Sequence, residues 1–320
     1  MINGVLRSNW LRANTQTIAI IVVFILLLIG FSFAEELFLS PRNLNNIARE
    51  SAPTVIVAVA MTFVITAGGI DLSPGSLLAV CGGALGILAL VINPVAALLI
   101  VLAIGAASGL FTGYISAYQG VAVFIVTLAL LTGLRGVAEL TTGGYSTPIT
   151  SDFLLWFGSG QFLGIYASAW FAILAAVVGS YLYSFTRYGR YVKAVGSNIE
   201  SARRVGINTQ RIRLATLVGT GFTAAVAGIL VATRLGSSSS NIGVAFELEA
   251  ITAVVLGGTS LMGGRGSVIG SVFGALTLGV LSNGLVLVGM DVYWVPIMQG
   301  AILLLAILAN YKIFSRINTS

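Results

Sequence analysis

Long apolar runs without a charged residue constrain this chain more than any other feature of its sequence. Ala13 to Ala34 is one such run of 22 residues, and Val268 to Gly289 is another. A helix needs about 20 apolar residues to cross the hydrocarbon core of a bilayer. Apolar residues are continuous in these runs and do not alternate with polar ones, which excludes a transmembrane β-barrel. The sequence therefore predicts an all-α membrane protein.

The composition leaves no room for a separate soluble domain. Hydrophobic residues make up 57% of the chain and charged residues 8%, whereas soluble domains carry about 25% charged residues. We therefore expect residues 1–320 to form a single transmembrane domain. Cys81 is the only cysteine and histidine is absent, which excludes a disulfide framework, a histidine proton relay and a histidine-ligated metal site.

The apolar runs predict about ten membrane-spanning helices. They cover residues 13–34, 52–66, 76–92, 95–118, 121–134, 165–184, 212–233, 250–261, 268–289 and 292–310. The eighth run is too short to cross a bilayer, so we expect some spans to be broken or re-entrant. The polar stretches 141–164 and 234–249 are expected to be extramembrane loops.

Positive charges collect on one side of this predicted topology. An even number of spans places both termini on the same side, which then holds 12 of the 16 Lys and Arg residues but only two of the ten Asp and Glu residues. An excess of Lys and Arg marks the cytoplasmic side, so we expect both termini in the cytoplasm. Arg135, Glu247 and Glu249 fall on the outer side in this count. The net charge of +6 is thus a topology signal and does not indicate a nucleic-acid partner.

Short motifs predict where helices begin and where they pack. Ser40 followed by Pro41 is typical of a helix N-cap with proline at the first helical position. Two doubled GxxxG patterns predict flat strips for close helix contact: Gly105, Gly109 and Gly113, and Gly266, Gly270 and Gly274.

The segment from Arg187 to Arg213 is the most basic stretch, with seven of the 16 Lys and Arg residues. Ser197 to Glu200 matches the S-x-x-E capping box, and Gly206 is placed to end the helix that follows. The pattern predicts a two-turn extramembrane helix from Asn198 to Val205, with Asn208 capping the next span. Such a helix is either gripped by a cytoplasmic partner or held by anionic lipid headgroups.

Two glycine-rich stretches break the helical pattern near membrane depth. The first is Gly68 to Gly75, where irregular backbone is tolerated only if it is buried in protein or lines water. Asp71 within it is either a functional ionisable residue or a cap for the helix that begins near Ser73. The second stretch is Gly257 to Gly264. Glu247 and Glu249 precede it, and we interpret them as helix-start acids and not as cation ligands.

The two breaks also echo each other in sequence. Val64 to Gly69 is similar to the stretch that begins at Val254, and small residues recur downstream of both. Transporters are often built from duplicated halves. In a chain with 39 glycines, coincidence is an equally good explanation at this stage.

The chain lacks the residues that energy-coupling chemistry needs. It contains no G-x-x-x-x-G-K-[ST] phosphate loop, no nucleophile–base pair and no metal-ligand pattern. We therefore expect no enzymatic activity and no cofactor. If ATP drives transport here, another chain must hydrolyse it.

Three ordered stretches resemble the ribose-type sugar permeases of ATP-binding-cassette importers, the ribose, xylose and galactose branch. They are Met61–Thr66 with Gly68–Ser73, Gly189–Tyr191 with Gly196–Asn198, and the run Phe246–Leu261. The similarity covers about residues 40–310. The chain departs from the family pattern at Glu249, where aspartate is common, at Pro74, where valine is usual, and at Ser197, where glycine is usual.

The resemblance implies a permease subunit in the bacterial inner membrane that carries a monosaccharide or related carbohydrate. Its implied partners are cytoplasmic ATP-binding subunits that grip the loop 186–211, a second permease copy or paralogue, a periplasmic sugar-binding protein and membrane lipid. The expected ATPase-coupling residues are Ser197, Asn198, Glu200, Arg203, Arg204 and Gly206. The expected path residues are Gly68, Gly69, Asp71, Ser73, Gly257, Gly258, Thr259 and Ser260.

A different class of transporter remains open at this stage. An ion-coupled secondary transporter or a channel would use Asp71, Glu247 or Glu249 as its ion site.

Overall fold

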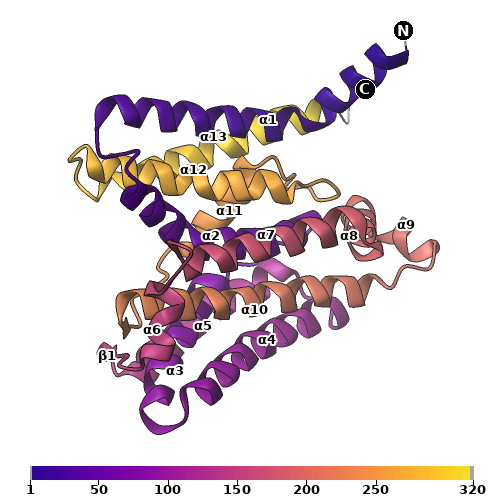
Figure 1. Cartoon of the computed structure of the whole chain (residues 1–320). Helices are drawn as coiled ribbons and strands as arrows, with labels where there is room; N and C mark the ends of the chain where they lie inside the picture. Colours follow the sequence, from indigo (N-terminus) through magenta and orange to yellow (C-terminus); the bar gives the residue numbers. More distant parts are fainter. Residues whose placement is uncertain (1, 318–320) are drawn as a thin grey trace.

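The computed structural model describes the backbone of residues 2–317 and the side chains of residues 17–308. Within that range the chain is helical apart from four two-residue strands and the connecting loops (Figure 1). The helices are α1 (Ile2–Ala34), α2 (Pro41–Thr66), α3 (Pro74–Val91), α4 (Pro94–Tyr118), α5 (Val123–Thr142), α6 (Asp152–Ser159), α7 (Ala167–Phe185), α8 (Arg187–Ser197), α9 (Ile199–Arg204), α10 (Thr209–Leu235), α11 (Phe246–Leu256), α12 (Val268–Leu287) and α13 (Trp294–Ile317). The strands are β1 (Thr147–Pro148), β2 (Gln161–Phe162), β3 (Ile165–Tyr166) and β4 (Ser237–Ser238).

The all-α membrane fold is confirmed. Eight helices of the described residues are long and apolar enough to cross a bilayer, namely α1 from Thr17 onward, α2, α3, α4, α5, α7, α10 and α12. A further apolar stretch, Trp294–Leu308, lies in α13. The predicted eighth span corresponds to α11, which has 11 residues and is too short to cross alone.

The helices form two groups that meet at α2. Figure 1 shows α1, α12 and α13 together on one side and α3, α4 and α10 on the other. Contacts of α2 with α7, α10 and α12 join the groups, and α2 is buried from Ser51 to Thr66. Helix α1 begins, and α13 ends, on the side of the bundle where α8 and α9 lie (Figure 1). The predicted topology likewise places both termini and the basic segment on one side. The side chains of Arg7, Arg12, Lys312 and Arg316, which entered the charge count, lie outside the described ones.

Helix starts follow the predicted chemistry. The Ser40 hydroxyl accepts a hydrogen bond from the Asn43 backbone N–H at 3.3 Å, and Pro41 is the first residue of α2. Asn93 caps α4 in the same way, with Pro94 following it. Proline suits this position because its missing N–H has no intrahelical partner there.

The glycine strips are close helix contacts, as predicted, except at Gly266, which precedes α12 and packs against side chains. On α4, Gly105 and Gly109 lie directly against Gly221 and Leu217 of α10, and a methyl group at Gly105 would overlap the Gly221 carbonyl. Gly270 and Gly274 of α12 lie in the same manner against the backbone of α11. Small residues permit this approach because no Cβ separates the two backbones.

The predicted loop 141–164 is more ordered than its sequence suggested. It contains α6 and strand β2, which pairs antiparallel with β3 just beyond the stretch. It also contains strand β1, which pairs antiparallel with β4 from a distant part of the chain. Arg49 of α2 holds this cap by donating to the Gly158 carbonyl at 2.6 Å and by lying 4.5 Å from the Tyr166 ring centre.

Candidate functional site

The basic segment forms two helices and not one. The predicted helix Asn198–Val205 is observed as α9, but the preceding α8 was missed. Its buried face contains Val192 and Val195, and Tyr188 stacks on Phe63 of α2 at 5.7 Å. Burial raises the pKa of Tyr188 and lowers that of Lys193 by removing water from their charged forms. Thus α8 is an amphipathic helix packed on the bundle.

The predicted capping box is wrong. The Asn198 side chain accepts from the Ser201 N–H at 2.8 Å and caps α9. Ser197 instead belongs to the last turn of α8, where its hydroxyl donates to the Lys193 carbonyl at 2.9 Å. Because α8 continues through Ser197, the extended backbone that an N-cap needs falls on Asn198. Glu200 pairs with Arg204 on the surface at 3.6 Å.

The far end of α9 follows the prediction. Gly206 has φ +84°, and its N–H donates to the Arg203 carbonyl at 2.9 Å. The next N–H, of Ile207, donates to Ala202 at 3.0 Å, which completes a Schellman motif. Asn208 then caps α10 by accepting from the Arg211 N–H at 3.0 Å. Both ends of α9 are therefore fixed, and the helix is held in one orientation.

The end of α8 touches both glycine-rich breaks. Gly196 packs against the Thr66 carbonyl at the end of α2, so closely that a methyl group there would overlap it. The Gly264 N–H donates to that same carbonyl at 2.8 Å. Gly263 lies against Gly68, and Gly264 lies against Ser197. We call these six residues, Thr66, Gly68, Gly196, Ser197, Gly263 and Gly264, the junction.

The junction brings together an expected ATPase-coupling residue, an expected path residue and four residues that were in neither group. Ser197 was expected to couple to the ATPase, and Gly68 to line the path. Thr66, Gly196, Gly263 and Gly264 were in neither set, although glycines in a last helical turn or a tight loop are a signal for close backbone contact.

The first break begins with a Schellman motif at the end of α2. Gly68 has φ +82°, and its N–H donates to the Ile65 carbonyl at 3.0 Å. The Gly69 N–H donates to the Val64 carbonyl at 3.0 Å. Positive φ at Gly68 is accessible because glycine has no Cβ.

The second break begins in the same way at the end of α11. Gly258 has φ +89° and donates to Val255 at 2.9 Å, and Thr259 donates to Val254 at 3.2 Å. These four residues match Gly68, Ile65, Gly69 and Val64 in the sequence echo. The echo is therefore accompanied by the same backbone hydrogen-bond pattern, which is a common way for helices to end.

Asp71 is buried within the first break and ties it to α10. Its side chain is 2% exposed. One carboxylate oxygen accepts from the Ser73 N–H at 2.9 Å and from the Ser73 hydroxyl at 2.7 Å. The other accepts from the Thr220 hydroxyl at 2.6 Å. Ser73 is the residue before α3, and no side chain caps that helix, so Asp71 fixes the turn ahead of the helix and does not cap it. Thr220 is a partner that the sequence did not indicate.

Most of the predicted path residues are buried in this conformation. Thr259 and Ser260 are enclosed, Gly257 packs against Gly270 of α12, and Gly68 is exposed. The Ser260 N–H donates to the Arg265 carbonyl at 3.0 Å. An open path along these residues therefore requires a rearrangement of the breaks.

The predicted outer loop 234–249 instead enters the bundle beside α3. Ser238 lies against Gly86, Ile242 against Gly82, and Gly243 and Glu247 against Gly75. The chain thus runs along a glycine stripe of α3 from the end of that helix to its beginning, as the short strand β4 followed by a series of turns. This overturns the placement of Glu247 outside the membrane. Its side chain is 6% exposed, and one of its carboxylate oxygens has no hydrogen-bond partner.

Arg135 of α5 holds this inserted segment. Its guanidinium donates to the carbonyls of Ser240, at 2.5 Å, Ile242, at 3.0 Å, and Gly243, at 3.2 Å. Non-helical backbone inside a bundle needs such donors. Glu249 is half-buried, with the Thr54 hydroxyl donating to it at 3.0 Å. Glu247 and Glu249 both lie in the first turn of α11, as predicted for helix-start acids. Arg135, which was counted on the outer side, belongs to α5.

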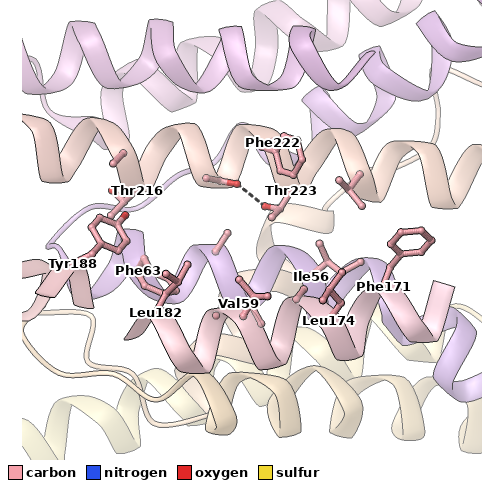
Figure 2. Close-up of a pocket in the computed structure, with 17 residues that line it drawn as sticks. Ile56, Val59, Phe63, Phe171, Leu174, Leu182, Tyr188, Thr216, Phe222 and Thr223 are labelled. Atoms are coloured by element: carbon pink, nitrogen blue, oxygen red, sulfur yellow. Dashed lines mark hydrogen bonds between the residues drawn. The ribbon is translucent and has the colours of Figure 1, made fainter. Parts of the chain in front are cut away.

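An apolar cavity lies apart from these groups. It has a volume of about 500 Å³ and lies between α2, α7 and α10 (Figure 2). Ile56, Phe63, Leu174 and Phe222 line it, with Tyr188 at one end (Figure 2). None of the predicted path residues lines it, and its apolar walls do not suit a polar solute.

Comparison with known proteins gives a family and several relatives. A model of the family described as "Branched-chain amino acid transport system / permease component" matches residues 43–307. The ribose import permease protein of Escherichia coli (strain K12) is 40% identical over 308 residues, 95% of this chain and 95% of that protein. The ribose import permease protein of Bacillus subtilis (strain 168) is 38% identical over 296 residues, 91% of each. The xylose transport system permease protein of Escherichia coli (strain K12) is 33% identical over 358 residues, 92% and 91%. No solved structure matches the chain.

Proposed function

The chain belongs to the family of branched-chain amino acid transport system permease components, and we propose that its solute is a monosaccharide or related carbohydrate. The family identifies the chain as the membrane-spanning permease subunit of an ATP-binding-cassette importer in the bacterial inner membrane, a transport subunit and not an enzyme. The family description names amino acids, but relatives matched along more than nine-tenths of the chain are named for ribose and xylose. The sequence resemblance is thus confirmed, and the relatives support a sugar.

An importer of this kind works with ATPase and binding-protein partners. We propose that cytoplasmic ATP-binding subunits contact the exposed side of α9, where Arg204 and Val205 lie at the surface. A second permease copy or a paralogue completes the translocation path. A periplasmic sugar-binding protein delivers the solute to the opposite side.

The junction is the observation that supports a coupling mechanism. When the ATPase subunits close, they displace α9 and the end of α8. Gly196 passes that displacement to Thr66 through a direct backbone contact, and Ser197 passes it to Gly264, against which its backbone and hydroxyl pack. The end of α2 and the loop after α11 then move together, since the Gly264 N–H is bonded to the Thr66 carbonyl.

The buried breaks are the parts that this motion opens. Each begins with a Schellman motif and precedes a new helix. The chain therefore changes direction there while the last carbonyls of the preceding helix keep hydrogen-bond donors. Movement at Gly68–Ser73 and Gly257–Ser260 exposes backbone groups and hydroxyls of Ser73, Thr259 and Ser260 to a polar solute. Such groups suit the hydroxyls of a carbohydrate.

Uptake measurements test the solute class. The chain is reconstituted in proteoliposomes with its ATPase and binding protein, and ATP-dependent uptake of labelled pentoses, hexoses and leucine is compared. We expect uptake of a sugar that excess leucine does not reduce. Uptake of leucine without sugar uptake would refute the carbohydrate proposal and would leave the family assignment intact.

Charge reversal at Arg204 tests ATPase docking. We expect Arg204→Glu to reduce co-purification of the ATPase subunit, because a negative charge replaces an exposed positive one on α9. Arg42→Glu, at the start of α2 on the opposite side, is the matched control and should leave co-purification unchanged. Normal assembly and uptake in Arg204→Glu would contradict docking at this surface.

A further inference from the structure

The apolar groove between α2, α7 and α10 has the form of a lipid-binding site. Its volume is about 500 Å³, and its walls consist of aliphatic and aromatic side chains apart from Tyr188, Thr216 and Thr223. The Thr223 hydroxyl is turned to its own helix, where it donates to the Gly219 carbonyl at 3.0 Å (Figure 2). The interior therefore offers little to a polar ligand.

The rim of the groove is open to the surface of membrane-spanning helices. Leu174 and Val178 of α7 and Phe222 of α10 line it and are exposed. Helices α2, α7 and α10 all carry apolar segments long enough to span a bilayer. The surrounding medium at this face is hydrocarbon, so the occupant at hand is an acyl chain.

One end of the groove has a positive charge next to it. Arg211, Ala215, Gly219, Phe222 and Val226 recur at intervals of three or four residues along α10 and so share one face. The last four line the groove, and Arg211 continues the stripe one turn beyond it, at the end where Tyr188 lies. Arg211 is exposed, and no ion pair or hydrogen bond of its side chain is seen among the described side chains.

More positive charge lies on α8 at that same end. Arg187 precedes Tyr188 directly, Arg190 follows two residues later, and both are exposed. The opposite end differs. Two cations of α2 lie on that side. Arg49 already donates to the Gly158 carbonyl and to the Ser159 hydroxyl, and Arg42 is about two helical turns further from the groove. Charge is thus available to a ligand at the α8 end.

We propose that the groove binds one anionic phospholipid of the cytoplasmic leaflet, with an acyl chain along α10 and the phosphate at Arg211. The assignment rests on the distribution of polar groups along the groove. A groove with apolar walls and exposed cations at one end is complementary to a ligand with an acyl chain and an anionic headgroup. Anionic headgroups are attracted to basic residues at the cytoplasmic surface. The inference depends on the place of the chain in the membrane and not on its solute.

The site would act on the coupling segment. Tyr188 lines the groove and belongs to α8, whose other end forms part of the junction. A bound lipid fills the space beneath Tyr188 and supports α8 against the bundle. Lipid occupancy therefore favours the arrangement in which α9 is presented to the ATPase.

The test is native mass spectrometry of the full chain, delipidated in detergent and then supplied with phosphatidylglycerol or phosphatidylcholine of identical acyl chains. We expect one phosphatidylglycerol to be retained in preference to phosphatidylcholine. Arg211→Gln should weaken retention of phosphatidylglycerol about fivefold without changing that of phosphatidylcholine. Arg42→Gln is the charge control and should bind as the wild type does.

Two groove-filling variants separate the groove from a general charge effect. A Cβ at Gly219 meets no atom within 4 Å, so Gly219→Leu fills the groove without a backbone clash and should abolish specific retention. Ala215→Leu on the same stripe is the second variant should the first fail to fold. Gly300→Leu of α13, where a Cβ also meets nothing, is the matched control with wild-type retention.

Three results would overturn the proposal. One is equal retention of the two lipids by the wild type, and another is unchanged retention of phosphatidylglycerol in a folded groove-filling variant. The third is a disulfide-linked dimer of Phe222→Cys under mild oxidation in the bilayer, which would show that a second copy covers the groove. Cys81 is buried, so the unmodified chain is the control for that measurement.

Discussion

At the scale of single residues, buried polar contacts and close backbone approaches define the candidate site. Asp71 was singled out from the sequence because an ionisable residue in a broken membrane segment is unusual. Its partner Thr220 lies 149 positions away on α10, and one threonine among many apolar residues gives no signal of its own. The sequence thus indicated the residue that matters and not the contact that holds it.

The contact between Asp71 and Thr220 can be measured directly. We expect Asp71→Ala and Thr220→Val each to lower the free energy of unfolding by about 1–3 kcal/mol, because each leaves a buried polar group without its partner. The double mutant should lose less than the sum, with a coupling energy of about 1 kcal/mol.

Thermal or denaturant unfolding of the purified chain provides the measurement. Thr223→Val is the matched control, since Thr223 bonds to carbonyls of its own helix. Strict additivity of Asp71→Ala and Thr220→Val would contradict the contact.

At the scale of elements, local chemistry predicted the ends of helices better than their surroundings. Ser40, Gly206 and Asn208 act as the sequence indicated, because capping depends on residues only a few positions apart. The capping box at Ser197 failed because α8, which packs on α2 and was not predicted, continues through Ser197.

Capping at Asn198 gives a prediction with its own internal control. We expect Asn198→Ala to destabilise α9 by about 1 kcal/mol, because the Ser201 N–H loses its acceptor. Ser197→Ala should leave α9 unchanged, since the Ser197 hydroxyl donates within α8.

Hydrogen exchange of the peptide covering residues 199–206 reports the difference. Exchange should be faster in Asn198→Ala than in Ser197→Ala. The opposite order would restore the capping box that the structure contradicts.

At the scale of the whole molecule, hydropathy and charge predicted the fold class, and the structure corrected the course of one segment. The stretch 234–249 was placed outside the membrane because it contains serines and two glutamates. Inside the bundle, Arg135 satisfies its carbonyls and a glycine stripe of α3 makes room for it. The hydrogen bonds from Arg135 and the space beside α3 both come from distant parts of the chain. The hydropathy and charge of the stretch itself therefore predict a loop.

The junction is also a feature of the whole molecule. In it the end of α8, the end of α2 and the loop after α11 are in direct contact. From the sequence, the basic segment and the two breaks were separate features, because contacts between segments so far apart in the chain leave no local signal. Under the proposed coupling, a displacement of one of them moves the other two.

The most direct test of this account is uptake per ATP hydrolysed in proteoliposomes that contain the complete importer with Gly196→Ala. The added methyl group overlaps the Thr66 carbonyl and must push α8 away from α2, while the surface of α9 is unchanged. Gly300→Ala of α13, where a Cβ meets nothing, is the control, and all values are normalised to assembled complex. We predict that the ATPase still binds and hydrolyses ATP while uptake per ATP falls about tenfold. A tenfold fall corresponds to about 1.4 kcal/mol, which is within the roughly 1–3 kcal/mol that overpacking costs. Uptake per ATP equal to that of the control would contradict the claim that the junction transmits the motion.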